Sequence, residues 1–319
     1  MTKKRIIITT MIIVILIAVG AIFATTLTQR APTRIPIKWG TALPGTYGYT
    51  VGSILINFME SQFPEEYDFS LITYPTSTAA EKAVMSREIQ VAQTGTPHFK
   101  DLYSGKGPYE GYTPPYGKRL VHVAYFYTLE IFLAVPSTEA GKYKSWADLS
   151  GKPIFFTKAG WGTWIMARYV WEALGYKFNH IEMDPATVAD ALKAGTVVAT
   201  VLYTSSRASL PAWIKELELK VDLTVINPSQ EEVAKLKAVG FEVVRIDPKR
   251  VFVKDVGVRE VIGIPFAYGL SSTTDMSEEF VYRLLKSIEK IKDELPKIEP
   301  GLWLIKEDFV GLQATGINS

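Results

Sequence analysis

The chain has 319 residues, of which 47% are hydrophobic and 21% charged, so it is long and apolar enough for two ordinary domains and is not a disordered protein. Its formal net charge is +2, and because Lys3, Lys4 and Arg5 lie at the extreme N-terminus, the rest of the chain is close to neutral, which argues against a nucleic-acid partner. The sequence contains no cysteine, which excludes disulfides, thiolate nucleophiles, zinc-thiolate sites and lipid attachment through an N-terminal cysteine.

The N-terminal segment has the pattern of a membrane-targeting sequence. No charged residue occurs from Ile6 to Gln29, and Ile6–Ala24 is dominated by Ile, Val, Leu and Ala behind the basic leader. We interpret residues 1–30 as a signal peptide or membrane anchor. The apolar run is close to the roughly 20 residues that span a bilayer, which favours an uncleaved anchor over cleavage near Ala24. The basic leader places the chain after Arg30 outside the cytoplasm, so an extracytoplasmic location is expected.

Strand and helix patterns alternate in the first part of the remaining chain. A strand is expected at 35–39, followed by the turn "GTALPGTYGYT" and a helix with apolar residues at helical spacing. The segment 69–75 repeats the strand, and the helix after it starts with Thr78 and Glu81 in capping-box spacing. Further strands are expected at 89–95 and 119–136, separated by a long loop at 98–118.

The second part repeats the same design. The sequence "GKPIFFTKAGWGTWIMARYVWEALGY" predicts a strand, a turn at 158–163 and a helix that ends at Gly175. Asp184 and Pro185 begin a helix that Gly195 terminates, and strands follow at 196–203, 221–226 and 241–246. A helix starts at Ser229, the apolar run 258–270 returns towards the first domain, and 277–295 is an amphipathic helix.

This alternation predicts an α/β fold with mostly parallel sheets, because parallel neighbours need crossover connections. We expect two such sheets in two lobes linked by crossing strands. Lobe 1 is assigned to residues 35–130 and 260–319, and lobe 2 to residues 131–259.

Two glycine-rich turns precede helices and can face each other across the lobes. Helix N-termini offer unpaired amides and about half a positive charge, which suits a small anion. A nucleotide cradle is not supported, because the P-loop ending and GxGxxG are both missing from the sequence. Catalysis is not supported either, since His98, His122 and His180 are isolated and the sequence has neither HExxH nor GxSxG. We therefore expect a protein that is not an enzyme and uses no cofactor or metal.

Four segments, "WGTALPGTYGYTVGSIL", "YPTSTAAEKAVM", "SWADLSGKPIFFTKAGWGTW" and "VYRLLKSIEKIKDEL", together resemble the TAXI family of TRAP-transporter solute receptors. The resemblance extends from about Ile37 to about Glu294. It implies a periplasmic-binding-protein-like fold of the second class, a small organic anion such as a carboxylate or amino acid as ligand, and delivery of that ligand to a TRAP-type membrane permease.

The resemblance also implies site residues. The family's first loop corresponds to Gly45, Thr46 and Tyr47, and its second-domain loop to Trp161, Gly162 and Thr163 after Gly160. Trp161 departs from the family pattern, because an indole replaces a small hydroxyl donor and adds a stacking face. The segment 196–206 also departs, with Val198 at the position where the family tends to have Asp.

Each candidate has a structural alternative. Thr46 and Tyr47 fit a helix cap and a surface aromatic, Trp161 fits packing between lobes, and Tyr125 with Tyr127 fits core packing on one face of a strand. Five further ligand-binding candidates follow the ends of strands and are equally compatible with caps, buried amides or solvated side chains: Ser77, Thr78, Gln93, Tyr203 and Arg207.

Three other functions remain open at this point. An ABC-type receptor for a pyrimidine precursor, nitrate or sulfonate would use the same lobed architecture. An enzyme on this fold is disfavoured, because the examples we considered depend on cysteine-bearing motifs. A signalling role, in which the anchored receptor presents its closed form to a membrane sensor, is the third.

Overall fold

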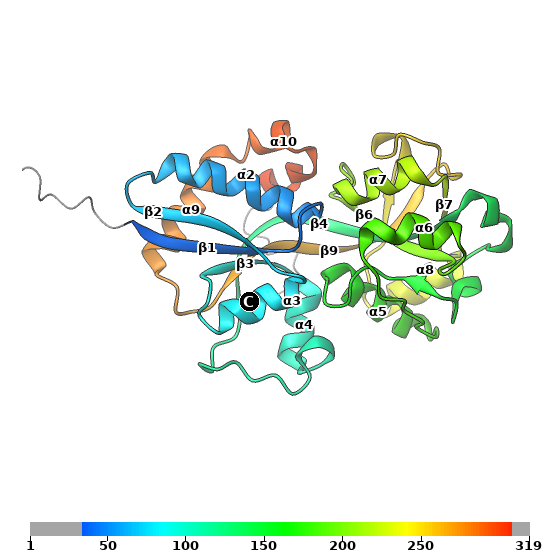
Figure 1. Cartoon of the computed structure of the whole chain (residues 1–319), viewed down its shortest axis with the longest axis horizontal. Helices are drawn as coiled ribbons and strands as arrows, with labels where there is room; N and C mark the ends of the chain where they lie inside the picture. The colour runs from blue at the N-terminus through cyan, green and yellow to red at the C-terminus, as the bar shows by residue number, and fades with distance from the viewer. Residues whose placement is uncertain (1–33, 308–319) are drawn as a thin grey trace, which may run out of the picture.

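The structure, a computed structural model, describes residues 34–307 (Figure 1). The predicted signal peptide or anchor at residues 1–30 lies outside this range. Within 34–307, no helix combines the length and hydropathy that a membrane crossing requires.

The expected alternation of strands and helices is present in lobe 1, on the blue and cyan side of Figure 1. Three parallel-paired strands form its sheet, and four longer helices and one short one accompany it. The strands are β1 (Ile35–Thr41), β2 (Tyr67–Thr73) and β3 (Val91–Gly95), and the helices are α2 (Tyr47–Gln62), α3 (Ser77–Met85), α4 (Thr96–Ser104), α9 (Glu278–Ile291) and α10 (Leu295–Ile298). Two 3₁₀ turns, η1 (Gly107–Tyr109) and η6 (Pro300–Lys306), complete the described part.

Lobe 2 has the same kind of construction from shorter strands. Its strands are β5 (Ile154–Phe155), β6 (Ala199–Ser205), β7 (Leu223–Ile226) and β8 (Val244–Ile246), and its helices are α5 (Gly162–Leu174), α6 (Val188–Lys193), α7 (Ala212–Lys220) and α8 (Gln230–Ala238). Four 3₁₀ turns connect them: η2 (Ser137–Lys142), η3 (Trp146–Leu149), η4 (Pro185–Thr187) and η5 (Pro248–Arg250).

Two long strands, β4 (Val121–Pro136) and β9 (Val261–Ser272), run through both lobes as an antiparallel pair (Figure 1). They join the lobes into one nine-stranded sheet in the order β2-β1-β3-β9-β4-β6-β5, with β7 and β8 attached to β4 and β9. The prediction of two mostly parallel sheets is therefore wrong, because the five pairings that involve β4 or β9 are antiparallel. An apolar run indicates burial but not strand direction. The boundaries proposed for the lobes stay a prediction, since β4 and β9 belong to both.

Two further predictions for lobe 1 need correction. The N-cap of α3 is Thr76, whose hydroxyl accepts from the Ala79 amide, so the predicted cap at Thr78 is wrong by two residues. The region 98–118 is not a continuous loop, because α4 occupies its beginning. Pro97 in the first turn and left-handed Gly105 at the end are signals that could have identified this helix.

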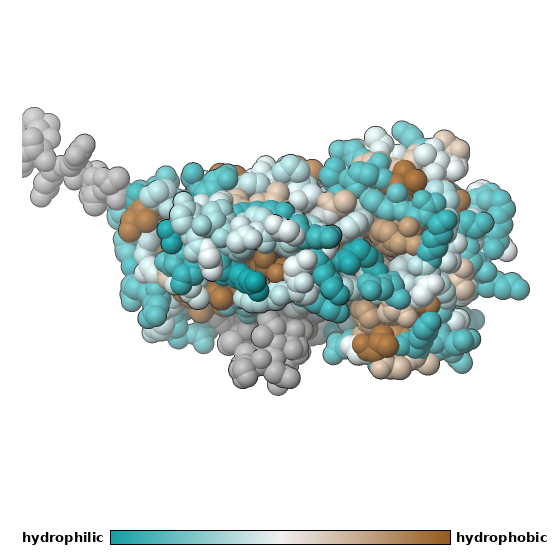
Figure 2. All heavy atoms as spheres, turned by 90° about the horizontal axis from the view of Figure 1, so that it is seen from below, coloured by the Kyte–Doolittle hydropathy of each residue, from teal (hydrophilic) through white to brown (hydrophobic). Residues whose placement is uncertain are grey.

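The larger of two hydrophobic core clusters of the described residues extends across the junction of the lobes, and the smaller one lies in lobe 1. The largest fully buried side chains of the larger cluster include Trp39 in lobe 1 and Trp146 and Trp171 in lobe 2. On the face shown in Figure 2, hydrophobic residues lie in separate patches among hydrophilic ones. This distribution suits a surface that faces water.

Candidate functional site

A small cavity lies where the two lobes meet, and we call it the inner cavity. Its volume is about 30 Å³, and a water molecule needs about 10 to 15 Å³ by this measure, so with the lobes in this arrangement the cavity holds very little. Its lining comes from both lobes and contains no charged side chain among the described residues: Ala42, Thr46, Tyr47, Gly48, Ser77, Tyr127, Leu129, Trp161, Gly162, Thr163, Tyr203 and Tyr268.

Three helix N-termini reach the inner cavity. Helix α2 begins after its N-cap Thr46, α3 begins at Ser77, and α5 begins after Trp161. Trp161 makes no side-chain capping bond, so the first amides of α5 have no side-chain acceptor from the cap residue. The first amides of a helix have no partner inside the helix, and the N-terminus carries about half a positive charge. Their convergence favours a negatively charged group without a basic side chain, and the Glu299 carboxylate, which accepts from the Tyr47 hydroxyl over 3.2 Å, acts against this effect.

Tyrosines form one wall of the inner cavity. The rings of Tyr47 and Tyr127 meet edge to face at 4.8 Å between centroids, and Tyr127 stacks on Tyr268 at 5.3 Å. Burial raises the pKa of each of these phenols above its ordinary value, so they remain protonated donors at neutral pH. The hydroxyl of Tyr127 is fully buried and makes no hydrogen bond with any described residue. A buried hydroxyl without a partner is costly, and a bound ligand would supply one.

The other hydroxyls around the cavity already have partners. Ser77 and the Tyr268 phenol lie 2.7 Å apart, and Thr163 lies 2.6 Å from the Thr157 hydroxyl. The Thr46 hydroxyl donates to the Leu43 carbonyl over 2.7 Å and accepts from the Tyr49 amide, so it caps α2 while it lines the cavity. These bonds fix the orientation of the lining before any ligand binds.

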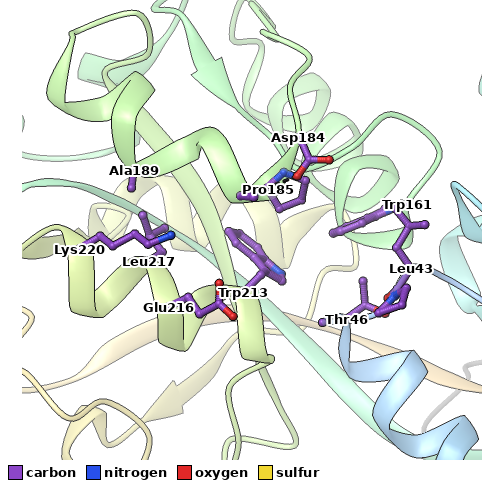
Figure 3. Close-up of a pocket in the computed structure, with 13 residues that line it drawn as sticks. Leu43, Thr46, Trp161, Asp184, Pro185, Ala189, Trp213, Glu216, Leu217 and Lys220 are labelled. Carbon is purple, nitrogen blue, oxygen red and sulfur yellow. Dashed lines mark hydrogen bonds between the residues drawn. The ribbon is translucent and has the colours of Figure 1, made fainter.

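A second space, which we call the outer chamber, adjoins the inner cavity at Thr46 and Trp161, which line both. Its volume is about 330 Å³. Figure 3 shows the indoles of Trp161 and Trp213 on two sides of it, with Pro185 beside them and Glu216 and Lys220 on α7. Its lining is completed by Leu43, Pro44, Gly45, Asp184, Ala186, Ala189 and Leu217.

Direct contacts hold the lobes together beside the inner cavity. The carbonyl of Gly160 accepts from the Thr78 hydroxyl over 3.0 Å, and the Trp161 indole N–H donates to the Pro75 carbonyl over 3.2 Å. Arg168 on α5 forms an ion pair of 2.6 Å with Asp101 on α4, whose carboxylate is fully buried. The described arrangement is therefore a closed one, with an ion pair that spans the two lobes.

Ionisable groups are buried close to the junction. Burial raises the pKa of Glu130 to about 7, although Thr128, Thr204 and the Arg207 amide all donate to its carboxylate. In lobe 1, burial lowers the pKa of His98 to about 4, so the imidazole is neutral at physiological pH.

The structure brings most of the predicted site residues together. Thr46, Tyr47, Ser77, Trp161, Gly162, Thr163 and Tyr203 line the inner cavity, and Gly45 lines the outer chamber. Three predicted residues line neither space. Thr78 bonds across the lobes to Gly160, Gln93 is buried behind the cavity with its amide oxygen accepting from Thr41, and the Arg207 guanidinium lies over the Trp303 ring at 5.3 Å. In this arrangement the Arg207 guanidinium therefore lies outside the lining of both spaces.

Sequence reasoning missed Tyr268 and Trp213, and it favoured core packing for Tyr127, which the structure places both in the main core cluster and in the lining of the inner cavity. Tyr127 was assigned to core packing with Tyr125 because residues two apart on a regular strand share a face. An irregularity in the β4–β9 register falls between these two tyrosines, so the two-residue period does not hold there. Tyr268 and Trp213 lie in apolar runs whose pattern gives no sign of a cavity. A family alignment would be needed to find them.

Solved structures share this fold at low sequence identity. A protein described as a periplasmic transporter aligns with a TM-score of 0.54 and 10% identity, over 85% of this chain and 87% of its own. The periplasmic aliphatic sulphonate binding protein SsuA from Escherichia coli aligns with a TM-score of 0.50 and 14% identity, over 85% and 78%. A Xanthomonas citri protein bound to ATP aligns with a TM-score of 0.50 and 10% identity, over 86% and 89%. The expected periplasmic-binding-protein-like fold is confirmed.

A family model matches residues 39–308, which is most of the chain. The family it describes is the NMT1-like family; the narrower resemblance to TAXI receptors stays a prediction. The chain belongs to the NMT1-like family.

Proposed function

We propose that this protein is an extracytoplasmic solute-binding receptor, which captures a small organic anion and delivers it to a membrane permease. One observation carries the proposal: three helix N-termini from two lobes converge on a cavity that is also lined by Tyr127, whose buried hydroxyl has no partner among the described residues. Amides and phenols suit an anion such as a carboxylate, because they donate hydrogen bonds and the helix ends favour negative charge.

The mechanism of capture is a hinged closure over the ligand. Contacts such as Trp161 to Pro75 hold the lobes together beside the inner cavity, whose volume of about 30 Å³ leaves little room, so we expect a ligand to enter when the lobes separate. β4 and β9 are the connections that bend, and the register irregularities in β4 mark where regular pairing is already interrupted. A ligand that bridges the N-termini of α2 and α5 adds contacts to both lobes, and so favours the closed arrangement.

Binding of a carboxylate is expected to raise the melting temperature of the protein. At a ligand concentration of 100 times Kd, the folded state gains about 2.7 kcal/mol, which corresponds to several degrees for a protein of this size. We would measure thermal shifts and titration calorimetry with short carboxylates, 2-oxoacids, amino acids and alkanesulfonates. A flat response across this panel would count against the proposal.

The proposed receptor could deliver its ligand to a TRAP-type or to an ABC-type permease, and the type of permease distinguishes these two alternatives. The resemblance to TAXI receptors supports a TRAP-type permease. The shared fold with the Escherichia coli sulphonate-binding protein supports an ABC-type receptor as the alternative. Cross-linking of the full chain to its partner in native membranes distinguishes them, because only an ABC transporter brings an ATPase subunit.

Tyr127→Phe is expected to stabilise the ligand-free protein and to weaken ligand binding. The substitution removes a buried hydroxyl without a partner, whose burial costs about 1–3 kcal/mol, and it removes a donor that the ligand would use. Chemical denaturation and calorimetry on the same samples measure both effects. Tyr109→Phe is the matched control, because the Tyr109 hydroxyl donates to buried Glu81 and its loss should destabilise the protein. If the Tyr127→Phe protein binds ligand with normal affinity, the Tyr127 hydroxyl is not part of the binding site.

A further inference from the structure

The outer chamber adjoins the inner cavity and shares lining residues with it. Thr46 and Trp161 border both spaces. The inner cavity of about 30 Å³ has no room for a side chain beyond a small anionic group, whereas the outer chamber offers about 330 Å³. A ligand with its anionic end at the helix N-termini therefore extends its remaining atoms between Thr46 and Trp161 into the outer chamber.

The walls of the outer chamber are suited to a flat ring. Figure 3 shows the indoles of Trp161 and Trp213 bordering it from α5 and α7, which belong to the same lobe. Both indole N–H groups are already engaged, with the Pro75 carbonyl at 3.2 Å and the Tyr203 hydroxyl at 3.3 Å. Trp161 and Trp213 are 4% and 7% exposed, and Phe155 and Tyr203 pack on the Trp213 ring, so the part of each indole that borders the chamber is what a ligand can contact. An apolar cavity of about 150 Å³ accommodates benzene, so one ring fits in this space.

The charges at the rim select against a second anionic group. Asp184, Glu216 and Lys220 are the charged side chains that line the chamber, and all three are exposed. Two carboxylates against one ammonium give the rim a net negative charge. A dicarboxylate would place its second carboxylate beside them, whereas an uncharged tail avoids this repulsion.

We infer that the outer chamber is a second subsite, which binds the uncharged aromatic tail of a monocarboxylate whose carboxylate occupies the inner cavity. This inference rests on the proposed function and narrows its substrate class to aromatic monocarboxylic acids. Trp161 is the residue that links the subsites, because its backbone begins α5 at the inner cavity and its indole borders the outer chamber.

Matched acids test the inference on the wild-type protein. Acetate, phenylacetate and indole-3-acetate carry the same head and differ only in the tail. We expect the two aromatic acids to bind at least about tenfold more tightly than acetate in calorimetric titrations. Succinate is expected to bind more weakly than phenylacetate, because of the acidic rim. 4-Guanidinobutyrate tests the alternative that the outer chamber binds a cationic tail. If its affinity exceeds that of acetate by as much as the affinity of phenylacetate does, the inference is overturned in favour of a cation subsite.

Two variants test whether the ring of the ligand binds in the outer chamber. Ala186→Trp puts bulk at an exposed position of its lining, and Trp213→Leu removes one aromatic wall. Each is expected to lower the ratio of phenylacetate affinity to acetate affinity by about tenfold. Ala212→Trp, on the exposed side of α7 and outside both spaces, is the matched control and should leave the ratio unchanged.

The outcomes separate the inference from the proposed function. If no carboxylate binds, the proposed function itself fails. The receptor function stands and the proposal of an aromatic subsite is wrong in two cases. In the first, the acids bind but the aromatic acids bind no more tightly than acetate. In the second, neither variant changes the ratio of phenylacetate affinity to acetate affinity.

Discussion

Arg168→Met is expected to weaken ligand binding by about a hundredfold. The substitution leaves the fully buried carboxylate of Asp101 without its cation, and among residues 34–307 only the Tyr169 hydroxyl still donates to it. Removing one partner of a buried ion pair costs about 3–5 kcal/mol. Because the Arg168 side chain is 23% exposed, we expect the lower end of that range, which corresponds to about a hundredfold in affinity.

This cost should fall on closure rather than on folding. Asp101 lies on α4 in lobe 1 and Arg168 on α5 in lobe 2, so separation of the lobes returns the unpaired carboxylate to water. Calorimetry with the best ligand of the panel gives the affinity, and small-angle scattering shows whether the ligand-free variant is more extended than the wild type. The free energy of unfolding should change much less than the affinity.

The double variant Asp101→Asn with Arg168→Met provides the control. Removing the charge from both partners leaves no buried unpaired ion, so most of the affinity should return. Arg245→Met, which breaks an exposed ion pair with Glu260 at the paired ends of β8 and β9, should change little. An affinity unaffected by Arg168→Met, or a loss that the double variant does not restore, would show that this pair is not part of closure.

Glu130→Gln is expected to change how stability depends on pH. The pKa of Glu130 is raised to about 7 in the folded protein, mainly by burial, against about 4.3 in an unfolded chain. Between these values the folded state binds more protons than the unfolded state, so wild-type stability falls as pH rises through this range. Between pH 5 and pH 8 we expect the wild type to lose about 2 to 3 kcal/mol relative to the variant.

Denaturant unfolding of both proteins at several pH values measures this difference. His98 has the opposite effect, because its pKa is lowered to about 4 and its contribution to stability is lost as pH falls below about 6.5. His98 is present in both proteins, so its contribution cancels in the comparison. Glu279→Gln, on the exposed surface of α9, should leave the pH dependence as in the wild type. Parallel curves for wild type and Glu130→Gln would mean that Glu130 is ionised in the folded protein.

The elements predicted most accurately are those with both a periodic apolar pattern and an end signal. Helix α5 ends at left-handed Gly175, and α8 follows its N-cap Ser229, whose hydroxyl forms a capping box with Glu232. Both signals act within a few residues, so the local sequence is sufficient. The cap of α3 was misplaced because Thr76 and Thr78 offer the same hydroxyl, and the contact of Thr78 with Gly160 in the other lobe is a tertiary one.

The sequence by itself determined the alternating α/β pattern, the glycine-rich turns and their position before helices, because these depend on local propensity and on apolar periodicity. It also indicated Thr46 and Thr163 as members of one site, and both line the inner cavity. Only the tertiary structure decided the direction of β4 and β9, the burial of Asp101 against Arg168, and the meeting of Tyr127 with Tyr268. Each of these joins residues distant in the chain, and strand pairing and close packing, unlike caps and turns, leave no mark in the neighbouring sequence.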